Sequence, residues 1–470
     1  MPKHKNYVTN KTGVKASVLY LFATLFNKGV MFLTVPVFTR LLSTSDYGVV
    51  TTFNSWVDIC TSILSMALYV SFNTAFNDYG ETIHDYLNTI ITFTLCVSGT
   101  VIVITCIGGS IFKFSLYFAV LALLQSMANA IITEYSQYLM MSFNYVERTI
   151  FMALPNFLSV IVSIVIIIDL SKDKYLGKII PTAIVFVLFA FVCLVRVFFK
   201  SKPKLNIVYI KYGLAISLPL VLHGIALNIL SQSARTMLTV MVGAHETGIF
   251  SLAFNFGMIA TVFTMALDGI WVPWFMNKLK QKTYSQINKA ASDYILLMSY
   301  IMLSVMLCGP ELLKLLAAKD YWEGISVIPS IVLSNYLIFL YTFHVYVEQY
   351  HKKTIIISLN TLTAAVFNII LNLYMIPKFG YIGAGVTMVV SYILSFSLHA
   401  LETKRLEPNL FSKKMFIRPC VLMILSLFIF YSFISNPFIR WITAFFLVML
   451  GIFVNKKTII TYLGSANKKG

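Results

Sequence analysis

Charged residues are scarce in this chain. Asp, Glu, Lys and Arg together make up 11% of its 470 residues, whereas soluble globular proteins contain about 25%. Hydrophobic residues make up 58%, in apolar runs of roughly 20 residues that are each long enough to cross a bilayer as a helix. Because lipid offers no partner to backbone polar groups, we predict an all-α polytopic membrane protein with about fourteen transmembrane helices.

The sequence also lacks the motifs of metal, redox and nucleotide chemistry. Its six cysteines lie apart inside apolar runs, without the spacing of disulfides or metal ligands. A phosphate-binding loop is missing, since Gly177-Lys178 is followed by Ile179 and has no glycine-rich segment before it. We therefore expect no metal, no cofactor and no ATP hydrolysis in this chain.

Acidic residues are half as numerous as basic ones, 18 against 36, which gives a net charge of +18. The basic residues gather in every second loop, as at Lys200–Lys204 and Lys404–Arg405, which is the positive-inside pattern of membrane proteins rather than a nucleic-acid surface. It predicts that both termini lie in the cytoplasm. The predicted spans are 14–38, 48–71, 87–111, 114–138, 149–168, 179–199, 213–236, 248–274, 291–310, 325–347, 354–376, 380–401, 416–434 and 437–455.

One polar turn occurs twice. The segments Thr39–Gly48 and Thr239–Gly248 agree at several positions, and each separates two long apolar runs. Such a repeat predicts two six-helix lobes related by a pseudo-twofold axis along the membrane normal. We assign 1–204 to the N-terminal lobe (spans 1–6), 205–403 to the C-terminal lobe (spans 7–12), and 404–470 to an extra helix pair (spans 13–14) with a cytoplasmic tail.

Ionisable residues inside the first two spans are candidates for function. Lys28 lies near the middle of the first span, where a cation costs about 2.5–3.5 kcal/mol, so it is predicted to face a wet cavity and bind substrate. The alternative is a lysine that reaches back to the interface. Asp58 lies in the middle of the second span with Asn54 on the same face. It is predicted to pair with Lys28 or to act as a coupling carboxylate.

The seventh span carries a polar stripe. Asn228, Ser231, Gln232 and Arg235 follow the i, i+3, i+4, i+7 spacing of one helix face, which either joins helices or lines water. Arg235 is predicted to grip a phosphate, with a headgroup contact at the interface as the alternative.

Three acids elsewhere complete the candidates. Asp268 in the eighth span is the second coupling candidate. Glu134 and Glu348 fall near predicted cytoplasmic boundaries, where acids are usually solvated.

Several segments resemble one family of transporters. They are Pro36–Leu42 with Asp46-Tyr47-Gly48, then Val242-Gly243 with Thr247–Ser251, and Asn368–Asn372 continuing through Ile376–Gly385. In their order and spacing the chain resembles the polysaccharide-unit flippases of the O-antigen and capsule type. These belong to the multidrug/oligosaccharidyl-lipid/polysaccharide exporter superfamily. One departure is Ala234-Arg235, where this family often has an Asp-Arg pair.

The resemblance implies a transporter, not an enzyme. Its cargo would be an oligosaccharide repeat unit on undecaprenyl pyrophosphate, moved by alternating access across the bacterial cytoplasmic (inner) membrane for O-antigen lipopolysaccharide or capsule biosynthesis. The implied partners are the bilayer, a glycan polymerase and a chain-length regulator. The sequence leaves H⁺, Na⁺ and the membrane potential open as the driving force. The alternatives are a drug or cation antiporter of the same superfamily and an integral-membrane glycan polymerase or glycosyltransferase.

Overall fold

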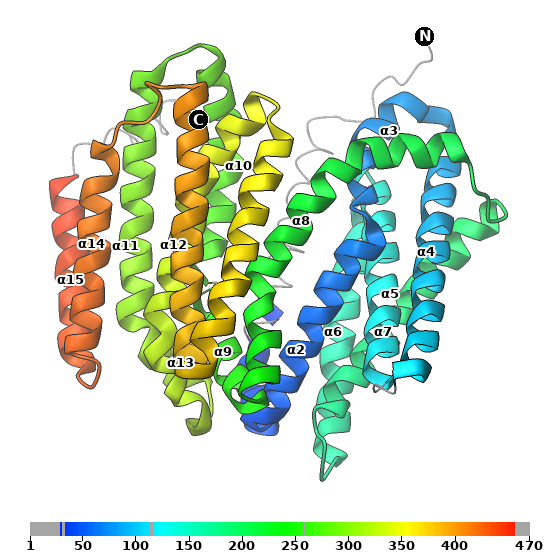
Figure 1. Cartoon of the computed structure of the whole chain (residues 1–470), viewed down its shortest axis with the longest axis horizontal. Coiled ribbons are helices and arrows are strands. Elements are labelled where there is room, and N and C mark those ends of the chain that lie inside the picture. The colour runs from blue at the N-terminus through cyan, green and yellow to red at the C-terminus, as the bar shows by residue number, and fades with distance from the viewer. Residues whose placement is uncertain (1–28, 31–32, 113–115, 258, 456–470) are drawn as a thin grey trace. The chain divides into compact units, whose positions relative to one another are not determined.

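The computed structural model describes residues 29–30, 33–112, 116–257 and 259–455. Regular secondary structure in these residues is entirely helical (Figure 1), which confirms the predicted all-α class. The chain divides into two compact units, 1–248 (unit 1) and 249–470 (unit 2). The predicted first lobe ends earlier, at residue 204, and the lobe assignment and its pseudo-symmetry stay predictions. Lys28 lies outside the described residues.

Unit 1 is built around α5, which packs against α2, α4, α6 and α7. Its core holds fully buried large side chains such as Phe72 and Tyr86. The long helix α8 consists of two segments, 207–218 and 223–241, which meet at a bend of 54°. The helical elements are α2 (Thr44–Ser65), η1 (Leu68–Ser71), α3 (Phe72–Tyr79), η2 (Gly80–Thr82), α4 (Ile83–Phe112), α5 (Leu116–Met141), α6 (Tyr145–Asp169), α7 (Leu176–Lys200) and α8 (Ile207–Met241).

Unit 2 has its most extensive packing between α12 and α13, while α11 packs against α10, α12, α14 and α15. Buried aromatic rings fill the centre, as where Trp271 packs against Phe343. Helix α9 (Ala244–Gly257) begins in unit 1 and continues into unit 2. The other elements are α10 (Ile259–Lys280), α11 (Tyr284–Leu316), η3 (Lys319–Val327), α12 (Ile328–Tyr350), α13 (Thr354–Leu406), α14 (Lys414–Ser432) and α15 (Pro437–Val454).

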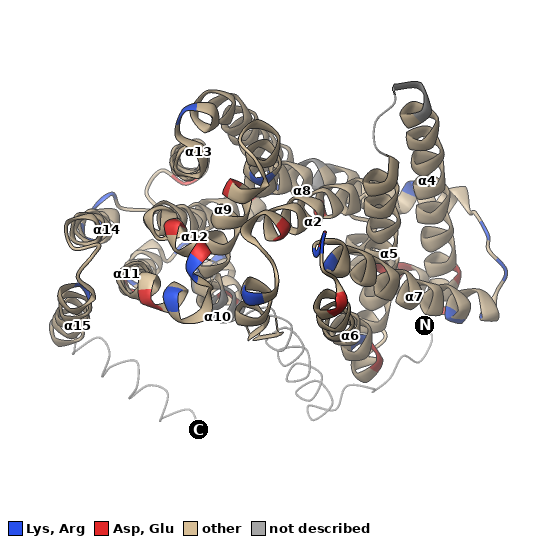
Figure 2. Ribbon diagram, turned by 90° about the horizontal axis from the view of Figure 1, so that it is seen from below, with Lys and Arg blue, Asp and Glu red and all other residues tan. Residues whose placement is uncertain are grey.

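Charges interrupt these helices rarely, and in Figure 2 most of the ribbon is neither blue nor red. Among the described residues, eight helices are long and apolar enough to cross a membrane, or nine if the two segments of α8 form one span. The chain is therefore a multi-pass membrane protein. Every predicted span from residue 48 onward overlaps a helix, but the total of fourteen is not confirmed, since most of the first span lies outside the described residues.

The predicted break between spans 354–376 and 380–401 falls inside α13. Gly380 there has φ 53° and ψ −137°, a backbone conformation open to glycine but not to residues with a Cβ. Pro377 removes one donor from the same turn. Two helices therefore meet at Gly380, at the boundary between the predicted spans 354–376 and 380–401.

Candidate functional site

Polar side chains join α2 to the second segment of α8, and we call this contact the α2–α8 seam. At its centre, Gln232 donates from Nε2 to Asp58 Oδ2 at 3.2 Å and accepts from the Arg235 guanidinium. Ser55 Oγ also donates to Gln232 Oε1, at 3.2 Å. Three residues that the sequence singled out, Asp58, Gln232 and Arg235, thus form one connected network.

Further polar contacts extend the seam in both directions. Asn228 Nδ2 donates to Ser62 Oγ at 2.6 Å, one turn from the centre. Ser231 turns to its own helix, where Oγ donates to the Asn228 carbonyl at 3.3 Å. On the other side, the hydroxyls of Thr52 and Thr239 are hydrogen-bonded at 2.6 Å. Numbering falls along α2 as it rises along α8, so the two helices run antiparallel.

The seam ends where the repeated turns meet. Ser43 caps α2 in a reciprocal pair with Asp46, as expected where a helix begins after a polar turn. The Gly48 backbone lies against the Ala244 carbonyl, and Gly248 lies against the Thr44 carbonyl, so neither glycine has room for a Cβ. Small residues four apart in both helices permit this approach. The contact is reciprocal, because Gly48 meets Ala244 and Gly248 meets Thr44.

Arg235 is buried in unit 1, with 8% of its surface exposed. Its guanidinium donates to Gln232 Oε1, and Asp58 is an acid that attracts it electrostatically. A guanidinium carries five N–H donors in a planar fork, a geometry that suits an anion bound by two parallel hydrogen bonds. Asp58 itself is exposed along α2, as is Asn54 one turn away.

Asp268, the second coupling candidate, lies on α10 in unit 2. The Tyr294 hydroxyl donates to Asp268 Oδ1 at 3.4 Å, and Tyr346 is also hydrogen-bonded to this carboxylate. The structure therefore places the two candidate acids in different units, each with its own polar partners. Their coupling roles, and the substrate roles of Lys28, Asn54 and the stripe, stay predictions.

The sequence analysis misplaced two other acids, because it expected Glu134 and Glu348 to be solvated. Both are completely buried. Thr94 Oγ1 donates to Glu134 Oε1 at 2.7 Å, and His399 Nδ1 lies 2.9 Å from Glu348 Oε2. For Glu348 the available signal was His399 in the predicted span 380–401, since a buried carboxylate requires a partner.

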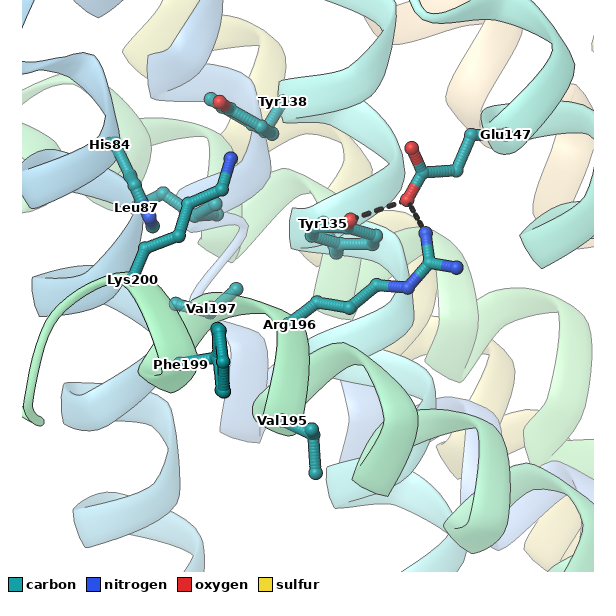
Figure 3. Close-up of a pocket in the computed structure, with 10 residues that line it drawn as sticks. All are labelled: His84, Leu87, Tyr135, Tyr138, Glu147, Val195, Arg196, Val197, Phe199 and Lys200. Atoms are coloured by element: carbon teal, nitrogen blue, oxygen red, sulfur yellow. Dashed lines mark hydrogen bonds and ion pairs between the residues drawn. The ribbon is translucent and has the colours of Figure 1, made fainter.

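A pocket of about 390 Å³ opens in unit 1, away from the seam residues. Figure 3 shows that Arg196 and the Tyr135 hydroxyl converge on Glu147, while the Lys200 side chain extends beside His84 toward Tyr138. Tyr135 donates to Glu147 Oε1 at 2.6 Å, and Arg196 forms an ion pair with the same oxygen. Sequence reasoning did not bring these residues together, since they come from four helices.

No described group of three or more His, Cys, Asp or Glu side chains is arranged to hold a metal ion. Within the part of the chain that the structure describes, none of the six cysteines forms a disulfide.

The chain shares its fold with solved transporters. The lipid II flippase MurJ, in an inward closed conformation, matches with a TM-score of 0.65 at 14% identity, over 95% of this chain and 100% of that chain. An inward-facing multidrug resistance MATE family transporter of the MOP superfamily matches at 0.60 and 12%, over 81% and 96%. The MATE multidrug transporter DinF-BH matches at 0.58 and 16%, over 87% and 99%.

These identities are low, so the structural matches establish the fold alone. No curated protein matches the sequence. Residues 14–279, more than half of the chain, match the family described as polysaccharide biosynthesis protein. The chain therefore belongs to the polysaccharide biosynthesis protein family and has the fold of the MOP superfamily transporters.

Proposed function

We propose that this protein is a flippase that moves an oligosaccharide repeat unit, linked to undecaprenyl pyrophosphate, across the bacterial cytoplasmic membrane. The glycan would serve O-antigen or capsule biosynthesis. Family membership and the fold shared with a lipid II flippase support this function. The observation that carries it is Arg235, a buried cation in the α2–α8 seam that is hydrogen-bonded to a neutral amide.

The chemistry of the cargo fits this arrangement. A pyrophosphate needs charge-assisted donors, and a guanidinium can present two parallel N–H groups to it. During alternating access, Arg235 exchanges its bond with Gln232 for bonds to the pyrophosphate, while Asn228, Ser231 and Gln232 turn to the sugars. Asp58 offsets the positive charge of Arg235 when the cargo is absent. Lys28 adds a second cation from the first span.

The test is complementation of a strain that lacks its own repeat-unit flippase. Arg235→Gln should abolish surface glycan and leave the lipid-linked unit on the cytoplasmic side, whereas Arg235→Lys should keep partial export because the charge remains. Arg40→Gln is the matched control, since Arg40 is an exposed arginine that donates to the Pro36 carbonyl of its own helix. Surface glycan at the wild-type level with Arg235→Gln, at equal protein abundance, would contradict the proposal.

One observation favours a second function, a drug or cation antiporter. The exposed carboxylate of Asp58 lies on the seam and could attract a cation, and the fold is shared with multidrug transporters. The two functions separate in one experiment. A cation antiporter should lose drug resistance with Asp58→Asn and keep it with Arg235→Gln, whereas the flippase should depend on Arg235.

The topology that this function requires has both termini in the cytoplasm. Reporter fusions after Lys469 and within Lys404–Lys414 should report the cytoplasm, and a fusion near Lys319 should report the outside. An external signal from the fusion after Lys469 would contradict this topology.

A further inference from the structure

The pocket in unit 1 is formed by the adjoining ends of four helices. His84 and Leu87 come from the start of α4, Tyr135 and Tyr138 from the end of α5, and Glu147 from the start of α6. The last turns of α7 supply the remaining wall, which includes Arg196 and Lys200. All four helix ends are predicted to lie at the cytoplasmic face. The pocket has a volume of about 390 Å³, which falls within the range of small-ligand sites.

The charges in this pocket do not balance. Glu147 is the one acid in the lining, and it already pairs with Arg196 and accepts from Tyr135. Among the described residues, no acidic oxygen lies within ion-pair distance of the Lys200 ammonium, whose side chain Figure 3 shows beside His84. One positive charge is therefore left over in the pocket.

His84 supplies a second feature that points to a ligand. Both of its ring nitrogens are buried, and neither has a hydrogen-bond partner among the described protein groups. An imidazole always carries at least one N–H donor, and a buried donor without an acceptor is costly. His84 and Lys200 come from different helices and lie beside each other, so together they present donors and positive charge to one anion.

The surface next to the pocket is apolar. On α7, Leu188, Phe191, Val195 and Phe199 are 57%, 62%, 48% and 90% exposed, at the spacing of one helix face. Val195 and Phe199 also line the pocket, so the apolar face leads directly from it. In a bilayer this face lies along acyl chains, while the helix ends lie at headgroup depth. A cationic pocket that adjoins the exposed apolar face of α7 is suited to an amphiphile with an anionic headgroup.

We propose that this pocket binds the phosphate headgroup of an anionic glycerophospholipid, with an acyl chain along the exposed face of α7. Lys200 and His84 hold the phosphate, and Tyr138 lines the pocket beside them. Glu147 forms an ion pair with Arg196 and so lowers the net positive charge of the pocket. This site is separate from the proposed cargo site at Arg235, and its occupancy joins α4 to α7.

Lipid binding to the purified full-length protein tests the site without any transport assay. After delipidation in detergent, native mass spectrometry measures the bound fraction against added phosphatidylglycerol. Removing a charged hydrogen-bond partner weakens binding by about tenfold or more, so Lys200→Gln should raise the dissociation constant of the tightest phosphatidylglycerol site by about tenfold. Lys202→Gln is the matched control, since it removes the same charge from an exposed loop residue outside the pocket.

A second variant tests the charge argument in the opposite direction. Glu147→Gln removes the carboxylate that occupies Arg196, so the affinity for phosphatidylglycerol should rise about threefold or more. His84→Phe keeps an aromatic ring but removes both nitrogens, so it should weaken binding while the melting temperature without lipid stays equal to or above that of the wild type. This variant keeps the test decisive if Lys200→Gln does not fold.

Three results would overturn the proposal. The first is equal affinity for phosphatidylglycerol and zwitterionic phosphatidylcholine in the wild type, and the second is an equal loss with Lys200→Gln and Lys202→Gln. The third is displacement of phosphatidylglycerol from the site by inorganic phosphate at millimolar concentration or by a polyprenyl pyrophosphate at lower concentration. Displacement would assign the pocket to a free anion or to the cargo.

Discussion

Replacing Gly48 with alanine should separate the two repeated turns. A Cβ at this position would fall far inside contact distance of the Ala244 carbonyl, whereas real Cβ contacts essentially begin at 3.0 Å. The obstacle is backbone on another helix, so α2 and α9 must move apart by about 1 Å or more. Overpacking of this kind costs about 1–3 kcal/mol.

Two further effects set the size of the change. The separation also strains the bond between Thr44 Oγ1 and His245 Nδ1, which are 2.5 Å apart; such bonds between membrane helices contribute about 0.6 kcal/mol each. Alanine gains about 1 kcal/mol over glycine in a helix, which acts in the opposite direction. We therefore expect Gly48→Ala to lower the free energy of unfolding by about 0.5–2.5 kcal/mol.

Reversible unfolding of the purified protein in mixed micelles measures this difference. Gly248→Ala should behave in the same way, because its Cβ would meet the Thr44 carbonyl. The double variant should lose less than the sum, since one separation relieves both overlaps. Gly99→Ala is the control, as nothing lies within 4 Å of its added Cβ. Wild-type stability in Gly48→Ala, or full additivity in the double variant, would refute the reciprocal contact.

Three other substitutions test buried features of unit 2, the first and third by the free energy of unfolding and the second by limited proteolysis. Glu348→Ala should cost about 3–5 kcal/mol, because it leaves the buried His399 without its partner, and a change below 1 kcal/mol would show that the pair is solvated. Arg440→Leu should loosen α15 and speed its proteolysis, because Arg440 is fully buried and bonds both Glu311 and the Leu307 carbonyl; unchanged cleavage would count against this anchor. Gly380→Ala should cost about 1–3 kcal/mol through its positive φ, and an unaltered stability would mean that the break in α13 can relax.

Local features of the sequence predicted much of the fold. Apolar runs located the helices from residue 48 onward, because a membrane helix requires a continuous apolar segment. The predicted spans 354–376 and 380–401 are adjacent, and the structure places the break inside α13 at Gly380, at the boundary between them. The 200-residue echo of Gly48 in Gly248 indicated equivalent turns, and the structure adds that these turns touch.

Pairings between distant helices could not be predicted in the same way. The stripe on α8 specified a polar face, but not that Gln232 would bond Asp58. Glu348 was misplaced because distance from a helix end says nothing about the helix that covers it, and His399 lies 51 residues away. In the pocket, Glu147 and Arg196 are 49 residues apart and meet only because α6 packs against α7.

The two segments of α8 are held by interactions of different kinds. At the start of the helix, Tyr209 and Tyr212 pack against Tyr79, with ring centroids 4.8 and 4.9 Å apart. Tyr79 in turn stacks on Tyr86 at 5.6 Å. Each such aromatic pair adds about 0.5–1.5 kcal/mol to the apolar burial, and water cannot replace it.

The second segment of α8 is joined to α2 mainly through the seam, with bonds such as Asn228–Ser62 and Gln232–Asp58. Hydrogen bonds of this kind contribute about 0.6 kcal/mol each in membrane proteins, because the separated groups find other partners. Water or a glycan hydroxyl can take the place of each partner at little net change in free energy. If Arg235 binds cargo as proposed, the hydrogen bonds of the seam are the ones that this binding exchanges, while the tyrosine contacts at the start of α8 stay in place.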